Sequence, residues 1–559
     1  MAVRLLRRPR AEPLNGVDPL YSELLRSRGL HDATEADYAL TGLIKPAGLK
    51  GFGSAVRLIE NAMSRGQSIL IVGDYDADGA TSVALLVSGL RALGANNVSY
   101  MVPDRFRLGY GLSPEIVDLA KANKPELLIT VDSGISSVAG VERARALGIK
   151  VIITDHHLPG ETLPDADAIV NPNQPECQFQ SKNLAGVGVA FYLLSGVRAR
   201  LREQNIEKAH QLNLARYLDL VALGTIADLV PLDRNNRILV DNGIRGIRAG
   251  RGNLGIKALL AIAGVDEEVV TTRDLAFALG PRLNAAGRIE NMSIGIECLL
   301  ASVDTAREFA EQLDELNLER RSIESSMRRQ ADDLLKSKDF LKTDSTGLCL
   351  YDQSWHEGVV GILASRIKDL LNRPVFVFAP AMDGSLKGSG RSIKGFHLTD
   401  ALAMIASEKP GLVSKFGGHA MAAGLSLEHD HLEEFSARFE QITRSQLGEE
   451  LREKVCYSDG AVSEFGLATV TKIVRDQPWG QGFEEPVFDD IFEIVSQRLL
   501  SGQHLKLQLR LKHSPLILEG IFFNRDQLIE DHESHFAYKL DVNRFRGVDR
   551  VQLVIQYQF

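Results

Sequence analysis

The stretch Ile69-Leu-Ile-Val-Gly-Asp-Tyr-Asp-Ala-Asp-Gly-Ala-Thr81 decides the fold of this chain. Its first four residues are all apolar, which predicts a strand that is buried on both faces of a sheet. Three carboxylates follow at alternate positions, Asp74, Asp76 and Asp78, and a helical pattern begins behind them. Carboxylates this close repel one another unless a cation neutralises them or their pKa values rise. The stretch therefore predicts a strand that ends at a charged site.

Two later strands are predicted to end in the same way. The apolar run at 127–131 leads into Asp132, and the run at 151–154 leads into the triplet Asp155-His156-His157. In an open parallel sheet, ligands bind outside the carboxyl ends of the strands, so we expect the three acidic ends to share one crevice. Because successive side chains diverge at a strand end, the two histidines can serve different partners, a metal and a substrate.

This donor set predicts a metal site and a class of reaction. Several carboxylates with one imidazole suit hard divalent ions, Mn²⁺ or Mg²⁺, better than zinc. Such a site is typical of two-metal hydrolysis of a phosphate ester or anhydride. An EF-hand calcium loop is one alternative, because Asp74–Gly79 fits its first six positions, but position twelve is Leu85 and a strand precedes the loop. The other alternative, a solvated turn with helix-capping aspartates, does not explain three acidic strand ends in succession.

The surrounding pattern predicts a doubly wound, mostly parallel sheet. Short β-rich runs at 68–72, 98–102, 127–131, 151–154 and 168–170 alternate with helical stretches such as 81–93 and 136–147. Two further helical stretches follow around 187–203 and 209–223. The charged stretch at 304–337 has apolar residues at helical spacing, which predicts a long helix that connects two domains. A second α/β region is predicted at 345–445.

The last hundred residues are β-rich and carry a cationic strand. Leucines at 505, 507, 509 and 511 alternate with polar residues, which predicts a half-buried strand whose outer face shows Lys506, Arg510 and Lys512. No acidic residue occurs from Ile494 to Leu518, so we expect this positive charge to be uncompensated locally. A groove for nucleic acid and an ordinary solvated β face explain the strand equally well.

Composition excludes several classes of protein. The chain has 559 residues, of which 44% are hydrophobic and 25% charged, as in soluble globular proteins of several domains. No apolar run approaches the roughly 18 residues that span a bilayer, and we expect neither a membrane protein nor a secretory signal. Four scattered cysteines fit a reducing cytosol and argue against disulfides or zinc. The net charge of −9 disfavours coating of duplex DNA by bulk charge, but it does not exclude a local basic channel that binds nucleic acid.

Several motifs resemble those of the DHH phosphoesterase superfamily. The four that occur in order are Asp74-Tyr-Asp-Ala-Asp-Gly79, Val131-Asp-Ser-Gly134, Asp155-His-His157 and Gly224-Thr-Ile-Ala-Asp228. The stretch Gly417-Gly-His-Ala-Met-Ala-Ala-Gly424 resembles the glycine-rich motif of the companion DHHA1 domain. Within the superfamily the chain is similar, over about residues 45–559, to the RecJ family of bacterial exonucleases, whose signatures resemble Gly280–Arg288, Trp355–Gly361 and Ser389–Ser392.

The resemblance implies an α/β fold in several domains. A DHH domain with a doubly wound, mostly parallel sheet is joined by a long helix to a second α/β domain, DHHA1, and a C-terminal β-barrel of the OB-fold type follows. We expect a helical arm at 1–45, the DHH domain at 46–303, the connector helix at 304–340, DHHA1 at 341–450 and the OB-fold at 451–559.

The resemblance also implies a set of site residues. Two Mn²⁺ or Mg²⁺ ions would be held by Asp74, Asp76, Asp78, Asp132, His156 and Asp228. The catalytic residues would be Asp76, Asp132 and His156, with Asp155 orienting the histidines and His157 contacting the scissile phosphate. Asp228 depends on the motif alone, because its position also suits a helix-end cap. The DNA backbone and its terminal phosphate would be bound by Arg105, Arg282, Ser389, Arg391, Gly418 and His419, although the glycine motifs also suit tight turns.

The implied activity is a single-stranded-DNA-specific 5′→3′ exonuclease that releases 5′-mononucleotides. The resemblance places it in DNA recombination and repair, including mismatch repair, in the bacterial cytoplasm, as a monomer with single-strand-binding protein and a RecQ-type helicase as partners. Two alternatives stay open. One is a hydrolase of pyrophosphate, cyclic dinucleotides or very short oligonucleotides, which the cationic terminal domain disfavours. The other is a non-catalytic DNA-binding scaffold, which the complete ligand set disfavours.

Overall fold

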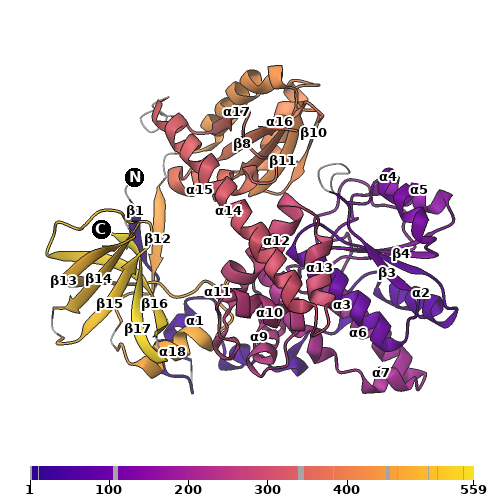
Figure 1. Cartoon of the computed structure of the whole chain (residues 1–559), viewed down its shortest axis with the longest axis horizontal. Helices are drawn as coiled ribbons and strands as arrows, with labels where there is room; N and C mark the ends of the chain where they lie inside the picture. Colours follow the sequence, from indigo (N-terminus) through magenta and orange to yellow (C-terminus); the bar gives the residue numbers. More distant parts are fainter. Residues whose placement is uncertain are drawn as a thin grey trace. The chain divides into compact units, whose positions relative to one another are not determined.

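The computed structural model of the chain describes residues 3–559, apart from 10–11, 15, 105–110, 338–344, 382, 449–452, 463, 502, 513 and 546. It divides into two compact units. The larger consists of Arg8–Leu316 and Asp459–Gln558, and the smaller of Met1–Arg7, Asn317–Ser458 and Phe559. The division falls within the long helix α14, Ala306–Ser337 (Figure 1).

The larger unit is built on a five-stranded parallel sheet with the strand order β3-β2-β4-β5-β6. One face packs on α3 (Ala77–Leu93) and α6 (Gly186–Glu203), and the other on α4 (Pro114–Ala120) and α5 (Val138–Ala146). Helices on both faces explain why the central strands β2, β4 and β5 are mainly apolar and buried without alternation. This confirms the predicted doubly wound sheet. Its strands are β2 (Ile69–Val72), β3 (Val98–Met101), β4 (Leu127–Val131), β5 (Lys150–Thr154) and β6 (Ala168–Val170).

A helical region follows the sheet in the same unit. The helix predicted around 209–223 is divided, because the side chain of Asn213 accepts the Ala215 N–H and starts a separate 3₁₀ turn, Leu214–Tyr217. The helices of this region are α7 (Glu207–Gln211), α8 (Leu218–Ala227), α9 (Arg234–Arg248), α10 (Leu254–Ile262), α11 (Thr272–Asp274), a π-helical turn (Leu275–Leu279), α12 (Gly280–Ile289) and α13 (Ser293–Leu300). Helix α2 (Phe52–Ser64) packs beside α6 and β6.

The N-terminal arm contains a strand as well as helices. Strand β1 (Val3–Arg7) pairs in parallel with β12 (Lys454–Ser458), and α1 (Pro19–Arg26) follows it. An arm that is helical throughout was therefore an incomplete prediction, because the partner strand lies far away in the sequence. Short 3₁₀ helices occur at Ala33–Ala36, Leu40–Gly42, Pro46–Gly48, Lys121–Asn123, Glu267–Val269 and His429–His431.

The C-terminal strands form a closed barrel in the order β13-β14-β15-β17-β16. Leu505, Leu507 and Leu509 of β14 point inward and are fully buried, as their alternation predicts. The barrel is joined to the sheet domain by a segment in which Trp479 and Phe483 belong to the same apolar core as α8 and α9. The elements are α18 (Leu467–Arg475), β13 (Phe488–Leu500), β14 (His504–Leu511), β15 (Ile517–Phe522), β16 (Glu533–Phe545) and β17 (Val548–Gln558).

The smaller unit is the second α/β region that the sequence predicts. Its sheet has the order β10-β11-β9-β8-β7, in which only β7 and β8 are parallel. The strands are β7 (Leu348–Tyr351), β8 (Val375–Pro380), β9 (Leu386–Arg391), β10 (Lys415–Gly418) and β11 (Ala422–Leu427), and the helices are α15 (Val360–Leu371), α16 (Leu398–Glu408) and α17 (Leu432–Gln446). In the described part of the chain, no helix has the length and apolar character needed to cross a membrane.

Candidate metal centre

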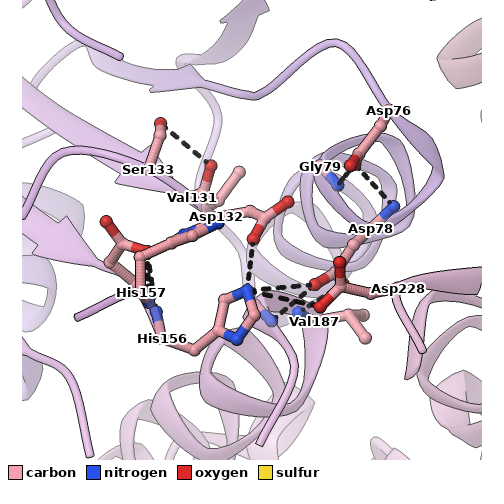
Figure 2. A network of polar contacts seen from close by, with 12 residues as sticks. Asp76, Asp78, Gly79, Val131, Asp132, Ser133, His156, His157, Val187 and Asp228 are labelled. Carbon is pink, nitrogen blue, oxygen red and sulfur yellow. Dashed lines mark hydrogen bonds and ion pairs between the residues drawn. The ribbon is translucent and has the colours of Figure 1, made fainter. Parts of the chain in front are cut away.

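The predicted acidic residues meet at the carboxyl ends of the parallel strands (Figure 2). Asp74 and Asp76 follow β2, Asp132 follows β4, and His156 follows β5. Asp228, from the end of α8, joins them although it lies 72 residues beyond His156 in the sequence. The predicted convergence of the strand ends is therefore present.

The imidazole of His156 is the centre of the cluster. Its Nε2 atom lies 3.1 Å from Asp132 Oδ1, 3.5 Å from Asp228 Oδ2 and 4.0 Å from Asp78 Oδ2. Three carboxylates around one nitrogen exceed what one imidazole can neutralise, because it carries at most one positive charge. Either additional positive charge or protonation of a carboxyl group is needed to make this arrangement stable.

Asp78 is fixed by the N-terminus of α6. Its Oδ2 accepts the Gly186 N–H at 2.6 Å and its Oδ1 accepts the Val187 N–H at 2.9 Å. Gly186 is required here, because a β-carbon at this position would lie 2.6 Å from the Cβ of Asp132. The helix terminus thus holds one acidic residue and lies directly against another.

Asp155 organises the two histidines. Its Oδ1 accepts the backbone N–H groups of His156 and His157 at 2.7 and 3.0 Å and lies 2.7 Å from His157 Nδ1, while its Oδ2 accepts the Ile135 N–H. Burial alone would lower the pKa of His157, but the hydrogen bond and charge of Asp155 raise it to about 9. Burial would likewise raise the pKa of Asp155, yet His157 keeps it below its usual value. His157 is therefore a cation at neutral pH.

The pKa values of the other buried carboxyl groups are raised, in contrast to that of Asp155. Burial, and then the charge of Asp76, raises the pKa of Asp78 to about 7. Burial and the neighbouring aspartates raise the pKa values of Asp132 and Asp228 well above the usual range. These side chains resist ionisation in the absence of a cation.

The geometry of the donor atoms fits metal ions. Three groups have ligand atoms within 4.8 Å of one another: Asp74 with Asp76 and Asp132; Asp78 with His156 and Asp228; and Asp132 with His156 and His157. Asp132 belongs to two of these groups, as a residue shared by two ions would. Carboxylate oxygens with imidazole nitrogen are the ligands of hard divalent cations. The residues present therefore fit the implied metals.

Comparison with known proteins identifies the family. Three family models match: "DHH family, N-terminal domain" at 68–225, "DHHA1 domain" at 344–445 and "RecJ OB domain" at 459–557. A curated relative named "Single-stranded-DNA-specific exonuclease RecJ", from Salmonella typhimurium (strain LT2), is 50% identical over 96% of this chain and 95% of its own length. The chain belongs to the RecJ family. The RecJ exonuclease of Escherichia coli (strain K12) is likewise 50% identical over 96% of this chain and 95% of its own.

A solved RecJ structure has the same architecture. The crystal structure of RecJ from Thermus thermophilus in complex with Mn²⁺ matches with a TM-score of 0.82 and 29% identity. The match covers 100% of this chain and 79% of that chain. The DHH, DHHA1 and OB domains that the resemblance implied are therefore confirmed.

Residues that the RecJ resemblance assigns to DNA lie in both units. In the smaller unit, Arg391 Nη1 donates to Ser389 Oγ at 3.1 Å and to the Gly390 carbonyl at 2.8 Å. Gly418 and His419 lie in the β10–β11 hairpin, so the motif does form the tight turn that was the alternative. In the larger unit, Arg282 forms an ion pair with Asp314 at 2.9 Å. Arg105 lies outside the described residues.

The uncompensated positive charge expected on the barrel was a wrong prediction. Lys506 lies 2.9 Å from Glu519, Arg510 lies 2.8 Å from Glu493, and Lys512 lies 3.5 Å from Glu533. Glu493 and Glu519 lie on β13 and β15, the strands that flank β14, and Glu533 lies on β16, so all three come from outside the acid-free stretch of sequence. The three cations remain candidates for a DNA groove, but each is paired in this structure.

Sequence reasoning missed two asparagines that support the histidines. Asn171 Nδ2 donates to the His157 carbonyl at 2.9 Å, and Asn173 Nδ2 donates to the His156 carbonyl at 2.6 Å. Asn171 follows β6 directly and Asn173 lies two residues later, at the same edge of the sheet as the acidic residues. That position was the only available signal, and it is weak because asparagine is common in turns.

Backbone strain also occurs at the candidate metal centre. Asp132 and Leu229 both have φ of +58°, and Leu229 is the only apolar residue among the described non-glycine residues with positive φ. Leu229 follows Asp228 at the end of α8, where a left-handed residue, usually glycine, ends many helices. A left-handed leucine is strained by about 1–2 kcal/mol.

Leu229→Gly should therefore stabilise the protein by roughly 0.5–1 kcal/mol, the strain relieved less the entropy cost of glycine. Little burial is lost, because Leu229 is 66% exposed. The measurement is the midpoint of thermal unfolding in chelator. Asn205→Gly, at a left-handed position after α6, is the matched control and should change stability less, since asparagine tolerates this conformation. A Leu229→Gly variant less stable than wild type would contradict the strain argument.

Proposed function

We propose that this protein is a metal-dependent, single-stranded-DNA-specific 5′→3′ exonuclease that releases 5′-mononucleotides. The observation that carries the proposal is the convergence of Asp132, Asp228 and Asp78 on His156 Nε2, in a chain of the RecJ family. Buried carboxylates with raised pKa values destabilise a fold, so a cluster of them indicates a functional site. Their place at the carboxyl ends of parallel strands, where ligands bind, favours a metal-dependent function. The complete donor set supports an enzyme rather than a scaffold.

The proposed cofactors are two Mn²⁺ or Mg²⁺ ions, held by Asp74, Asp76, Asp78, Asp132, His156 and Asp228. When bound, such ions supply a nucleophile at neutral pH and screen the charge of the phosphate. The RecJ structures from Thermus thermophilus in complex with Mn²⁺ and with Mg²⁺ support this choice. The chain itself supplies fixed ligand positions, through the α6 N-terminus on Asp78 and through Asp155 behind the histidines.

His157 is proposed to contact the scissile phosphate. Its Nδ1 is held by Asp155, which orients the ring and keeps the imidazole protonated. A fixed cation beside the reacting group attracts the phosphodiester and stabilises negative charge that develops on its oxygens.

A pocket for the terminal phosphate is proposed around Arg391 in the smaller unit. Partial burial lowers the pKa of Arg391, and no ion pair of this guanidinium is found in the described part of the chain. Ser389 Oγ lies beside it, and a β-carbon on Gly361, at the N-terminus of α15, would be 3.0 Å from both side chains. A half-buried arginine, a hydroxyl and a helix N-terminus together favour a bound anion.

Arg391→Lys should weaken binding of 5′-phosphorylated single strands about tenfold while changing kcat little, because lysine loses the bidentate fork but keeps the charge. The measurement is KM and kcat on oligonucleotides with a 5′-phosphate and with a 5′-hydroxyl. Only the phosphorylated substrate should be affected. Arg438→Lys, which alters an arginine paired with Glu434 in the same unit, is the control. Equal losses on both substrates would argue against a 5′-phosphate pocket.

Further assignments rest on the family and are proposals for this chain. We propose a role in recombination and repair in the bacterial cytoplasm, as a monomer that works with single-strand-binding protein and a RecQ-type helicase. The predicted domain boundaries at 45/46, 303/304, 340/341 and 450/451 are proposed as well, and the ranges of the three family models support their order. Lys506, Arg510 and Lys512 are proposed to exchange their acidic partners for DNA phosphates.

One assay tests the proposed activity. A single oligonucleotide is labelled at the 5′ end in one sample and at the 3′ end in another, and it is offered single-stranded or annealed with Mn²⁺, Mg²⁺ or chelator. We expect immediate release of 5′-labelled mononucleotide and gradual shortening of the 3′-labelled strand, from single strands only. Equal degradation of blunt duplex would contradict the strand specificity. No cleavage of DNA, with hydrolysis of a cyclic dinucleotide or pyrophosphate, would reject the substrate but keep the chemistry.

A further inference from the structure

The acidic loop after β2 runs directly into the N-terminus of α3, where several backbone N–H groups lack a partner within the helix. Asp76 is the N-cap residue, and its Oδ1 accepts the N–H groups of Asp78 and Gly79, both at 3.0 Å. The carboxylate of a predicted metal ligand is therefore also a helix cap. One further amide, that of Ala77, needs another acceptor.

Asn284 supplies this acceptor from a distant part of the sequence. Its Oδ1 accepts the Ala77 N–H at 2.8 Å, although the two residues are 207 positions apart. Asn284 lies on α12, within the Gly280–Arg288 motif. One turn later on the same helix, Gly287 lies against the carbonyl of Tyr75, which a β-carbon at position 287 would overlap. Helix α12 thus touches the residue before Asp76 and the residue after it.

These two contacts fix the backbone on both sides of Asp76. Without the Asn284 acceptor, the Ala77 N–H would compete for the Asp76 carboxylate or lose its hydrogen bond in a partly buried position. Either result would shift the carboxylates of the loop, of which Asp74 and Asp76 belong to one donor group with Asp132. A metal site depends on ligand positions held within about 0.5 Å by such supporting contacts.

We propose that Asn284 is a positioning residue that sets the metal affinity of the acidic loop. The inference rests on the proposed metal-dependent function and assigns a role to a residue outside the ligand set. Asn284 would act through the Ala77 amide, without touching the metal or the DNA. This role explains why an asparagine stands on the α12 face that packs against the loop.

The test compares two substitutions of similar size. Asn284→Leu removes the acceptor oxygen, whereas Asn284→Asp keeps an acceptor at the same place. Mn²⁺ binding to the full chain is measured by the electron paramagnetic resonance signal of free Mn²⁺, without DNA. We expect Asn284→Leu to weaken Mn²⁺ binding about tenfold, the usual minimum for loss of a contact behind a ligand. Asn284→Asp should bind Mn²⁺ almost as tightly as wild type.

A matched control separates positioning from general destabilisation. Asn253 caps α10 in the same unit, where its Oδ1 accepts the Gly255 N–H at 2.9 Å. Asn253→Ala should lower the unfolding temperature in chelator but leave Mn²⁺ affinity unchanged. Wild-type affinity in Asn284→Leu, or an equal loss in both Asn284 variants, would overturn the inference. Failure of the wild type to bind Mn²⁺ would instead overturn the proposed function on which it rests.

Discussion

Asp132→Asn should reduce the exonuclease rate by at least about 10³-fold, which corresponds to about 4 kcal/mol of transition-state stabilisation. Asp132 belongs to two of the three donor groups, and its Oδ1 lies 3.1 Å from His156 Nε2. Asparagine keeps the size of the side chain but removes the charge and one of the two carboxylate oxygens. The measurement is the initial rate of mononucleotide release in Mn²⁺ over a range of metal concentrations.

The same substitution should stabilise the metal-free protein. Burial and four neighbouring aspartates raise the pKa of Asp132, so the ionised carboxylate opposes folding when no cation is present. We therefore expect a higher unfolding temperature for Asp132→Asn in chelator at about pH 8, and a smaller increase on addition of Mn²⁺. Single-strand binding in chelator should be unchanged, as measured by fluorescence anisotropy.

Asp219→Asn is the control for loss of a buried carboxyl. Asp219 is buried in the same unit, where it accepts the Leu220 N–H and a hydrogen bond from the Asn253 backbone, and burial raises its pKa to about 6. Its removal should leave the dependence of the rate on Mn²⁺ unchanged. If Asp132→Asn retained more than about a tenth of the activity, a loss below 1.4 kcal/mol, the shared-ligand role would be wrong.

The sheet and most of the metal centre could be predicted because their signals are local. The three strands that lead to the site, β2, β4 and β5, are short and mainly apolar, and an acidic residue follows each within two positions, as at Asp132 and Asp155. Topology then brings the strand ends together, because parallel strands present their carboxyl ends at one edge. Asp228 is the exception. It comes from the end of α8, and only the family motif indicated it.

The features that were missed depend on partners far away in the sequence. Strand β1 is defined by pairing with β12, and the charge of Lys506 is balanced by Glu519 on the next strand. Asn284 reaches Ala77 across 207 residues. Amphipathic periodicity and local charge counts carry no information on such pairs. They therefore predict which residues are available, and not which residues meet.

Stability without metal should increase as the pH falls from about 8 to about 6. Burial raises the pKa of Asp78 to about 7, whereas an aspartate in an unfolded chain titrates near 4. Above pH 7 both states are ionised, and the folded state bears the full cost of the buried charge. As the pH falls through 7, the folded state takes up a proton that the unfolded state does not bind, so the free energy of unfolding increases. The raised pKa values of Asp132 and Asp228 act in the same direction.

Mn²⁺ should reverse this trend, because metal ions bind the ionised carboxylates and compete with protons. With Mn²⁺ in excess, the protein should be most stable at about pH 8 and lose stability toward about pH 6 as protons displace the ions. The measurement is thermal unfolding at several pH values, in chelator and in Mn²⁺. Groups outside the site, such as Asp219, contribute equally to both curves and cancel in their difference. In Asp132→Asn, the pH dependence of the unfolding temperature in chelator and that in Mn²⁺ should become more nearly parallel. Parallel curves for the wild type would show that these carboxyl groups are not the metal ligands.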